Sequence, residues 1–245
     1  MEGKRNILIG LLLLHLIGLF AQNNERIYQA YITSNMGLWK KTIDSLEHTS
    51  HLVNAKKLDL LNYQYGYIGW CIDQNRNKEA NEHISKARDI IKQLENDQYK
   101  LSMLQAYNSA LIGFEIGISP YKAPFIGAKS QHYAEKSIAI DSSSALGYEQ
   151  LGHIYYYKPK LFGGSKIEAV KYYEKALVLM ETQALNLKAN WNYLNLLATI
   201  VKAYIELEQY EMAMTYSLKA LQVEPEFDWI KNTLHPQLLK KISDE

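Results

Sequence analysis

The chain has 245 residues, of which 47% are hydrophobic and 22% charged, and its 27 basic residues nearly balance 26 acidic ones. This composition is that of a folded globular protein, and it excludes a disordered polar chain, a collagen-like fibre and a protein with many membrane spans. The formal net charge of +1 also argues against a nucleic-acid partner held by bulk charge.

Residues 1–21 have the layout of a secretory signal peptide. Lys4 and Arg5 form a short basic start, an apolar run follows, and Ala21 precedes a polar stretch. The apolar run is shorter than the roughly 20 residues that a membrane-spanning helix needs. We therefore expect cleavage after about Ala21 and an exported protein, periplasmic or secreted, with no stable membrane anchor after cleavage. An uncleaved signal anchor is the alternative.

Residues 22–56 predict an additional pair of helices at the start of the mature chain. Within MGLWKKTIDSLEHTSHLV, the side chains of Trp39, Ile43 and Leu46 recur at helical spacing and would share one face.

From residue 25 onward, apolar residues recur at spacings of three and four, which predicts helices throughout and an all-α fold. A shift of the chain by 39 residues shows an internal repeat. This shift aligns IGFEIGISP at 112–120 with LGHIYYYKP at 151–159. It also aligns YAEKSI at 133–138 with YYEKAL at 172–177. The pattern predicts that each unit consists of a helix, a loop with a proline and a second helix. Such pairs complete a core only by stacking on their neighbours.

The repeat region divides into four units without a flexible linker between them. We place the units at about 57–98, 100–142, 143–182 and 187–225, and a C-terminal capping helix, interrupted at Pro236, at 226–245.

The last two units resemble the tetratricopeptide repeat. In that family, a large residue, a Leu–Gly pair and a Tyr mark the first helix, and Ala, an aromatic residue and Ala mark the second. The third unit has Tyr148, Leu151-Gly152, Tyr155, Ala169, Tyr173 and Ala176, and the fourth has Leu197, Ile200-Val201, Tyr204, Ala213, Ser217, Ala220 and Pro225. The first two units match more weakly. The resemblance implies a right-handed α-solenoid of stacked antiparallel helix pairs.

Catalytic motifs are sparse, and we expect no enzyme, no cofactor and no metal. His48 and His51 lie three residues apart, but a zinc site would need further ligands. The loop FGGSK has the wrong residue order for a phosphate loop, and Ser165 with Glu168 instead predicts a capping box at the start of a helix. The single cysteine, Cys71, lies in an apolar run and is expected to be a buried thiol.

In a solenoid of this family, the first helices of successive units line the concave face. Carried onto this sequence, the family positions give a candidate binding groove made of Tyr63, Tyr67, Trp70, Tyr107, Phe114, Glu149, His153, Tyr156, Asn195 and Lys202. Aromatic rings give large apolar contacts at little rotamer cost, and a tyrosine keeps a hydroxyl for hydrogen bonding. The alternative is ordinary packing between helices. The register of the first unit depends on Gly66 being its small residue.

Two functions are consistent with these patterns. The first is an exported scaffold that binds a protein or peptide partner through an aromatic-lined concave groove. The alternative is a periplasmic component that binds an apolar small molecule, because the loop KPKLFGG is similar to one in the helical partner of some solute transporters. Unlike that partner, this chain has no cysteine for a lipid anchor after its apolar start.

Overall fold

The computed structural model describes residues 22–183 and 187–244, so the signal peptide expected at 1–21 lies outside the described residues. Its regular elements are all helices, and no described residue lies in a strand, which confirms the all-α prediction. No helix in the described part combines the length and apolar character needed to cross a bilayer.

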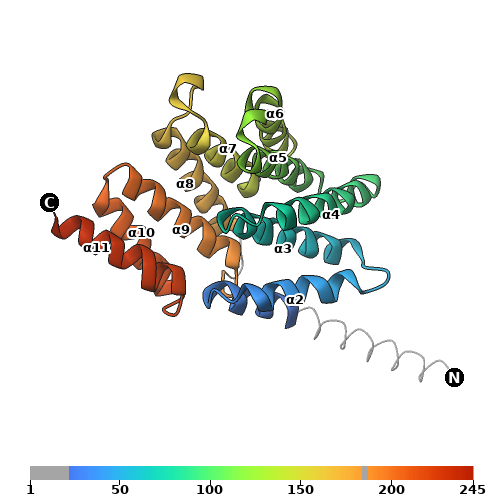
Figure 1. Cartoon of the computed structure of the whole chain (residues 1–245), viewed down its shortest axis with the longest axis horizontal. Coiled ribbons are helices and arrows are strands. Elements are labelled where there is room, and N and C mark those ends of the chain that lie inside the picture. Colours follow the sequence, from blue (N-terminus) through green and yellow to red (C-terminus); the bar gives the residue numbers. More distant parts are fainter. Residues whose placement is uncertain (1–21, 184–186, 245) are drawn as a thin grey trace.

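The helices form hairpins that succeed one another along the chain (Figure 1). In order, they are a helical segment at 22–32, α2 (Met36–Glu47), α3 (Asn54–Asp73), α4 (Asn77–Asn96), α5 (Leu101–Ile118), α6 (Ala123–Ile140), α7 (Ala145–Tyr157), α8 (Lys166–Gln183), α9 (Trp191–Glu206), α10 (Tyr210–Val223) and α11 (His235–Ser243). The pairs α3/α4, α5/α6, α7/α8 and α9/α10 have the most extensive contacts, and the second helix of a pair also packs on the first helix of the next.

The internal period is visible in the helix ends. Helix α5 ends at Ile118 and α7 ends at Tyr157, which is 39 residues later. Each is followed by a short 3₁₀ helix, η1 (Pro120–Lys122) and η2 (Lys160–Phe162), in the loop where a proline was expected. Equivalent sequence therefore gives equivalent hairpins in these two units.

The start of α8 confirms one half of the predicted capping box. The backbone N–H of Glu168 donates to Ser165 Oγ at 3.2 Å, which satisfies one of the unpaired donors of the first turn. The Glu168 carboxylate does not complete the box, because the Ser165 N–H donates to the Tyr155 carbonyl at 2.9 Å. The carboxylate pairs with Lys171 at 2.6 Å instead.

The C-terminal segment differs in detail from the interrupted helix expected there. A wide π-helical turn (Ile230–Leu234) runs directly into α11, and Pro236 lies in the first turn of α11. A proline cannot donate a hydrogen bond to the preceding turn, and the turn before Pro236 is the widened one. The irregularity therefore precedes Pro236.

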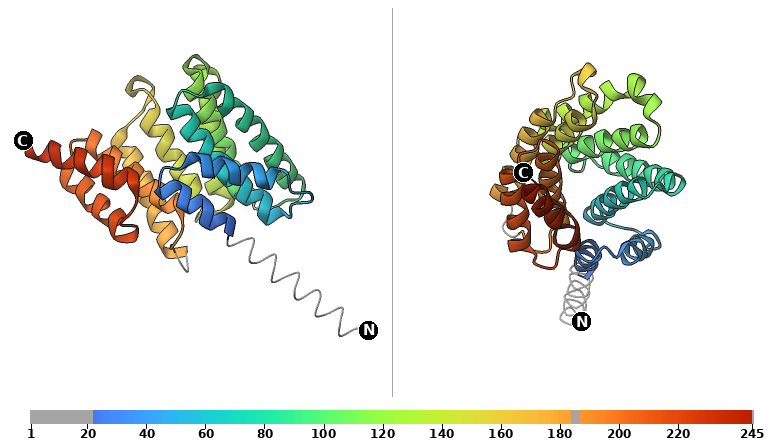
Figure 2. Two further views of the ribbon diagram at one scale, coloured as in Figure 1. Left: turned by 60° about the horizontal axis from the view of Figure 1, so that its bottom comes forward. Right: turned by 60° about the vertical axis from the view of Figure 1, so that its left-hand side comes forward.

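The N-terminal helix contacts the segment that follows α10. Tyr28 donates to Glu224 Oε2 at 2.8 Å, and Ser34 Oγ donates to Asp228 Oδ2 at 2.6 Å. The ring of Tyr31 lies 5.2 Å from that of Phe227. In the right-hand view of Figure 2, the blue N-terminal helices accordingly lie beside the orange and red C-terminal ones. The helices thus close into a ring.

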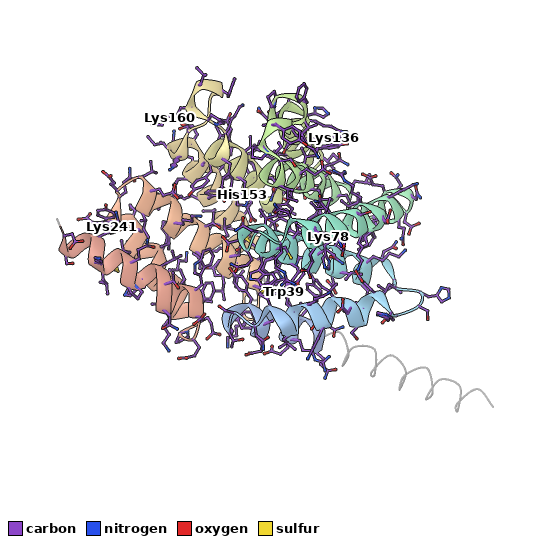
Figure 3. All side chains as sticks on the ribbon, in the orientation of Figure 1. Trp39, Lys78, Lys136, His153, Lys160 and Lys241 are labelled. Carbon is purple, nitrogen blue, oxygen red and sulfur yellow. The ribbon has the colours of Figure 1, made fainter. Side chains whose placement is uncertain are left out.

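The centre of the ring is packed with aromatic side chains. The rings of Trp39 and Trp191 lie 4.9 Å apart, edge to face, and both are buried. A Cβ atom on Gly66 would lie 2.6 Å from Trp39 and 2.7 Å from Trp191, so only glycine fits between them. Figure 3 shows Trp39 between α2 and α3.

Candidate functional site

The first helices of the four units, α3, α5, α7 and α9, meet at the side chain of Tyr65. Its ring lies 5.8 Å from that of Tyr107, 5.5 Å from Phe114 and 6.4 Å from Trp191. These are ordinary distances for packed aromatic pairs. The inner face of the helices is therefore held together by rings from three different units.

The register expected for α3 differs from the one observed. Its inner face carries Asn62, Tyr65 and Gly69: Tyr107 donates to Asn62 Oδ1 at 3.0 Å, and a Cβ on Gly69 would lie 3.8 Å from the Phe114 ring. The expected register depended on Gly66 being the small residue of the first unit. Gly66 lies against Trp39 and Trp191, and this contact accompanies the observed rotation of α3.

The three candidate residues on α3 consequently point elsewhere. Tyr63 donates to Asn24 in the N-terminal helix. Tyr67 donates to Glu79 of α4 at 2.9 Å. The indole of Trp70 lies under the guanidinium of Arg76, 4.9 Å from its ring centre.

A buried hydrogen-bond network connects α3, α7 and α8. Tyr65 donates to Glu149 Oε1 at 3.4 Å and accepts from Gln150 at 3.3 Å. His153 Nε2 lies 3.5 Å from Glu149, and its Nδ1 lies 2.9 Å from the hydroxyl of Tyr173. His153 is near the centre of the molecule in Figure 3.

The electrostatics of this network keep its phenols protonated. Burial, and then the negative charge of Glu149, raise the pKa of Tyr65 well above its usual value. Burial is also the largest cause of the raised pKa of Tyr173. Both phenols are therefore protonated at neutral pH, and the Tyr65 hydroxyl donates to Glu149.

Burial divides the ten candidate residues. Tyr63, Tyr67, Tyr107 and Glu149 are at most 4% exposed, so their side chains are not available to a partner in this structure. The half-buried ones are Trp70, Phe114, His153, Tyr156 and Asn195, and Lys202 is exposed. Asn195 accepts from Tyr31 at 3.0 Å and so takes part in the ring closure. Apart from Asn195, near the start of α9, the accessible candidates lie in the C-terminal halves of α3, α5, α7 and α9.

An aromatic cluster with one exposed member lies at the end of α7. We call it the tyrosine edge, and it consists of His153, Tyr156 and Tyr157. Tyr157 is 70% exposed, and its ring lies 4.8 Å from Tyr156 and 6.3 Å from His153. Tyr157 was not among the predicted groove residues, because Tyr156 is the last of the family positions that were applied to α7. The run of three tyrosines before Lys158 was the available signal.

The tyrosine edge is joined to α9 through Glu206. Tyr156 donates to this carboxylate, which also pairs with Lys166, and Lys166 Nζ lies 5.6 Å from the centre of the Tyr156 ring. The hydrogen bonds from Lys166 and Tyr156 and the charges of Lys166 and Lys202 outweigh the effect of burial and lower the pKa of Glu206. The edge therefore presents an aromatic surface beside fixed charges of both signs.

Tyrosine hydroxyls also connect helices to one another elsewhere in the fold. Seven tyrosine hydroxyls donate to glutamates: Tyr28 to Glu224, Tyr65 to Glu149, Tyr67 to Glu79, Tyr156 to Glu206, Tyr193 to Glu181, and both Tyr204 and Tyr216 to Glu174. Bonds of this kind, with a charged acceptor, are stronger than neutral ones. These seven bonds fix the packing of one helix on another, and two of the donors, Tyr67 and Tyr156, are groove candidates.

Metal ligands do not gather anywhere in residues 22–183 and 187–244: no group of three His, Cys, Asp or Glu side chains there could hold an ion. His48 Nδ1 lies 2.6 Å from the carbonyl of Asp44 at the end of α2, and His51 is exposed. A surface depression beside α4 has polar walls that include Lys40, Arg76 and His83.

Comparison of the chain with protein-family models and with curated proteins gives no match to either. The resemblance to the tetratricopeptide repeat therefore depends on the residues of the third and fourth units alone.

Proposed function

We propose that the chain is an exported scaffold of the tetratricopeptide type that acts by binding a protein or peptide partner at the tyrosine edge. His153 and Tyr156 belong to the groove expected on the concave face, and Tyr157 beside them is 70% exposed. Tyr63, Tyr67 and Tyr107 are buried among the chain's own helices, so a partner would lie across the ends of the inner helices.

The exposure of Tyr157 is the observation that carries this proposal. A tyrosine that is 70% exposed beside two half-buried rings has the arrangement of an interface anchor, since it can bury a large ring while its hydroxyl finds a polar partner. His153 and Tyr156 are fixed by hydrogen bonds, so little side-chain entropy is lost on binding.

The test is affinity capture of the full chain from an envelope extract, compared with the variant Tyr157→Ala. Loss of an anchor of this kind costs about 2 kcal/mol of binding, roughly a thirtyfold weaker affinity, and should remove a specific partner from the eluate. Val178→Ala on α8 is the matched control, because Val178 is 52% exposed on the second helix of the same pair. An eluate unchanged by Tyr157→Ala contradicts the proposal.

A further inference from the structure

Two loop tips expose large apolar side chains to solvent. Tyr121 and Phe125, at the α5/α6 connection, are 74% and 83% exposed, and Leu161 and Phe162, in η2, are 87% and 65% exposed. We call these four residues the apolar tips. Exposed apolar side chains that gather in one region mark interaction surfaces, whereas scattered ones need no explanation.

The two tips lie at the same edge of the molecule. The α5/α6 and α7/α8 connections both project at the top of Figure 1, and they stay neighbours in both views of Figure 2. Lys158 Nζ, at the base of the second loop, is 3.5 Å from Gln131 Oε1 of α6, which joins the two hairpins.

The second tip is held rigidly in its exposed position. The N–H groups of Phe162 and Gly164 both donate to the carbonyl of Pro159, at 2.9 and 3.1 Å, and Ser165 N–H donates to Tyr155 at 2.9 Å. A Cβ on Gly164 would lie 1.6 Å from the Lys158 carbonyl oxygen, so the turn requires glycine. The loop is thus built to keep Leu161 and Phe162 outside the core.

The two segments that carry the tips are basic in sequence. No Asp or Glu occurs at 116–134 or at 150–167, whereas these segments contain Lys122, Lys129, Lys158, Lys160 and Lys166. Of the five lysines, Lys166 pairs with Glu206, and the other four form no ion pair with a described residue. Figure 3 shows Lys160 on the projecting α7/α8 loop.

We propose that the apolar tips and their lysines dock this protein on the surface of an anionic lipid bilayer. Aromatic and aliphatic side chains that project beyond a ring of lysines match the interface of such a membrane, where the apolar groups enter the acyl boundary and the ammonium groups meet the lipid phosphates. A protein partner would have to enclose two separate convex projections, whereas a bilayer meets both in one plane.

The experiment places a polarity-sensitive fluorophore at the tip of the full chain, through Leu161→Cys. Cys71 is buried, so the new thiol is labelled selectively. Vesicles of phosphatidylglycerol and phosphatidylcholine should shift the emission to the blue, vesicles of phosphatidylcholine alone should not, and added salt should reverse the shift. Val178→Cys, labelled in the same way on α8, is the matched control and should not respond.

Two variants separate the apolar from the charged contribution. Phe125→Ser with Phe162→Ser should weaken vesicle binding at least about tenfold, because two rings no longer enter the membrane. Lys160→Gln should weaken it about fivefold. The far-ultraviolet circular dichroism of both variants should equal that of the unaltered chain, since these side chains lie outside the core.

Four results would overturn the proposal. They are an unchanged emission at position 161, an equal response at position 178, an equal response to phosphatidylcholine vesicles, and a shift that grows with protein concentration in the absence of vesicles. The last would identify a second copy of the chain as the occupant. Tyr157→Ala should leave vesicle binding intact, so this experiment fails or succeeds independently of the proposed partner site.

Discussion

Gly113 and Gly152 occupy the same place in the internal period, yet only Gly152 has a close neighbour. A Cβ on Gly152 would lie 2.4 Å from the ring of Tyr173, whereas one on Gly113 would meet nothing within 4 Å. The cause is the partner residue, since the position equivalent to Tyr173 in the preceding unit is Ala134. The close approach of paired helices that the repeat pattern implies is thus present in one unit and relaxed in the other.

This difference predicts opposite effects of the same substitution. Gly152→Ala should lower the free energy of unfolding by about 1–3 kcal/mol, because the added methyl group overlaps Tyr173. Gly113→Ala should raise it by about 0.4–1 kcal/mol, because alanine restricts the unfolded chain and fits the helix without a clash. Urea unfolding of both variants measures the two values. Equal effects would mean that Gly152 has room that the structure does not show.

Single residues also mark the limit of sequence prediction. The burial of Cys71 was predicted from its apolar run and is confirmed, and burial raises the pKa of its thiol to about 11. The neighbours of Gly66 could not be predicted from the sequence. In the stretch YQYGYIGW the five large aromatic or apolar residues are distributed all round the helix, so periodicity gives no preferred face. The deciding contact is with Trp191, far along the chain.

At the scale of elements, helices and their ends were predictable wherever a local signal exists. Spacing of apolar residues predicted the all-α class, and the hydroxyl of Ser165 caps α8 as its sequence context indicated. The tyrosine-to-glutamate bonds were not predictable, because each depends on how two helices are rotated relative to one another. Glu174 on α8, for example, accepts from Tyr204 on α9 at 2.6 Å and from Tyr216 on α10 at 2.8 Å.

These bonds predict a sharp sensitivity to alkali. Burial, followed by the hydrogen bond to Glu174, raises the pKa of Tyr204 and of Tyr216 above the usual value of 10.0. A pKa raised by folding contributes stability that is complete below about pH 10, where an unfolded tyrosine begins to ionise, and is lost as the pH rises further. The free energy of unfolding should therefore fall above about pH 10.

The measurement is a titration followed by phenolate absorbance and by circular dichroism. The tyrosines that donate to glutamates should ionise only as the helical circular dichroism signal is lost. Both changes should occur in one cooperative step. Tyr121→Phe is the control, because Tyr121 is 74% exposed and its removal should leave that step unchanged. Glu174→Gln removes the acceptor charge and should make the step less steep. Full ionisation of all tyrosines with the helical signal intact would contradict the assignment.

For the whole molecule, the closure of the ring is the feature that local sequence patterns could not indicate. The repeat pattern predicts contacts between helices that are adjacent in the sequence. Tyr31, near the start of the fold, also contacts residues near its end. Its ring lies 6.1 Å from Trp39, 5.7 Å from Trp191 and 5.2 Å from Phe227. An open array of repeats transmits a local defect only to the next unit, whereas a closed ring joins the first helices to the last.

Ring closure predicts that Tyr31→Ala loosens both ends of the chain together. The substitution removes three aromatic contacts and the hydrogen bond to Asn195, and should cost about 3 kcal/mol of stability. Hydrogen–deuterium exchange should then speed up in α2 and α3 and, to a similar degree, in α9 and the segment around Phe227. Tyr172→Ala is the control: this ring stacks on Tyr155, 5.2 Å away within its own helix pair, so faster exchange should stay within α7 and α8. Faster exchange confined to residues 22–47 in Tyr31→Ala would mean that the two ends are neighbours without being energetically coupled.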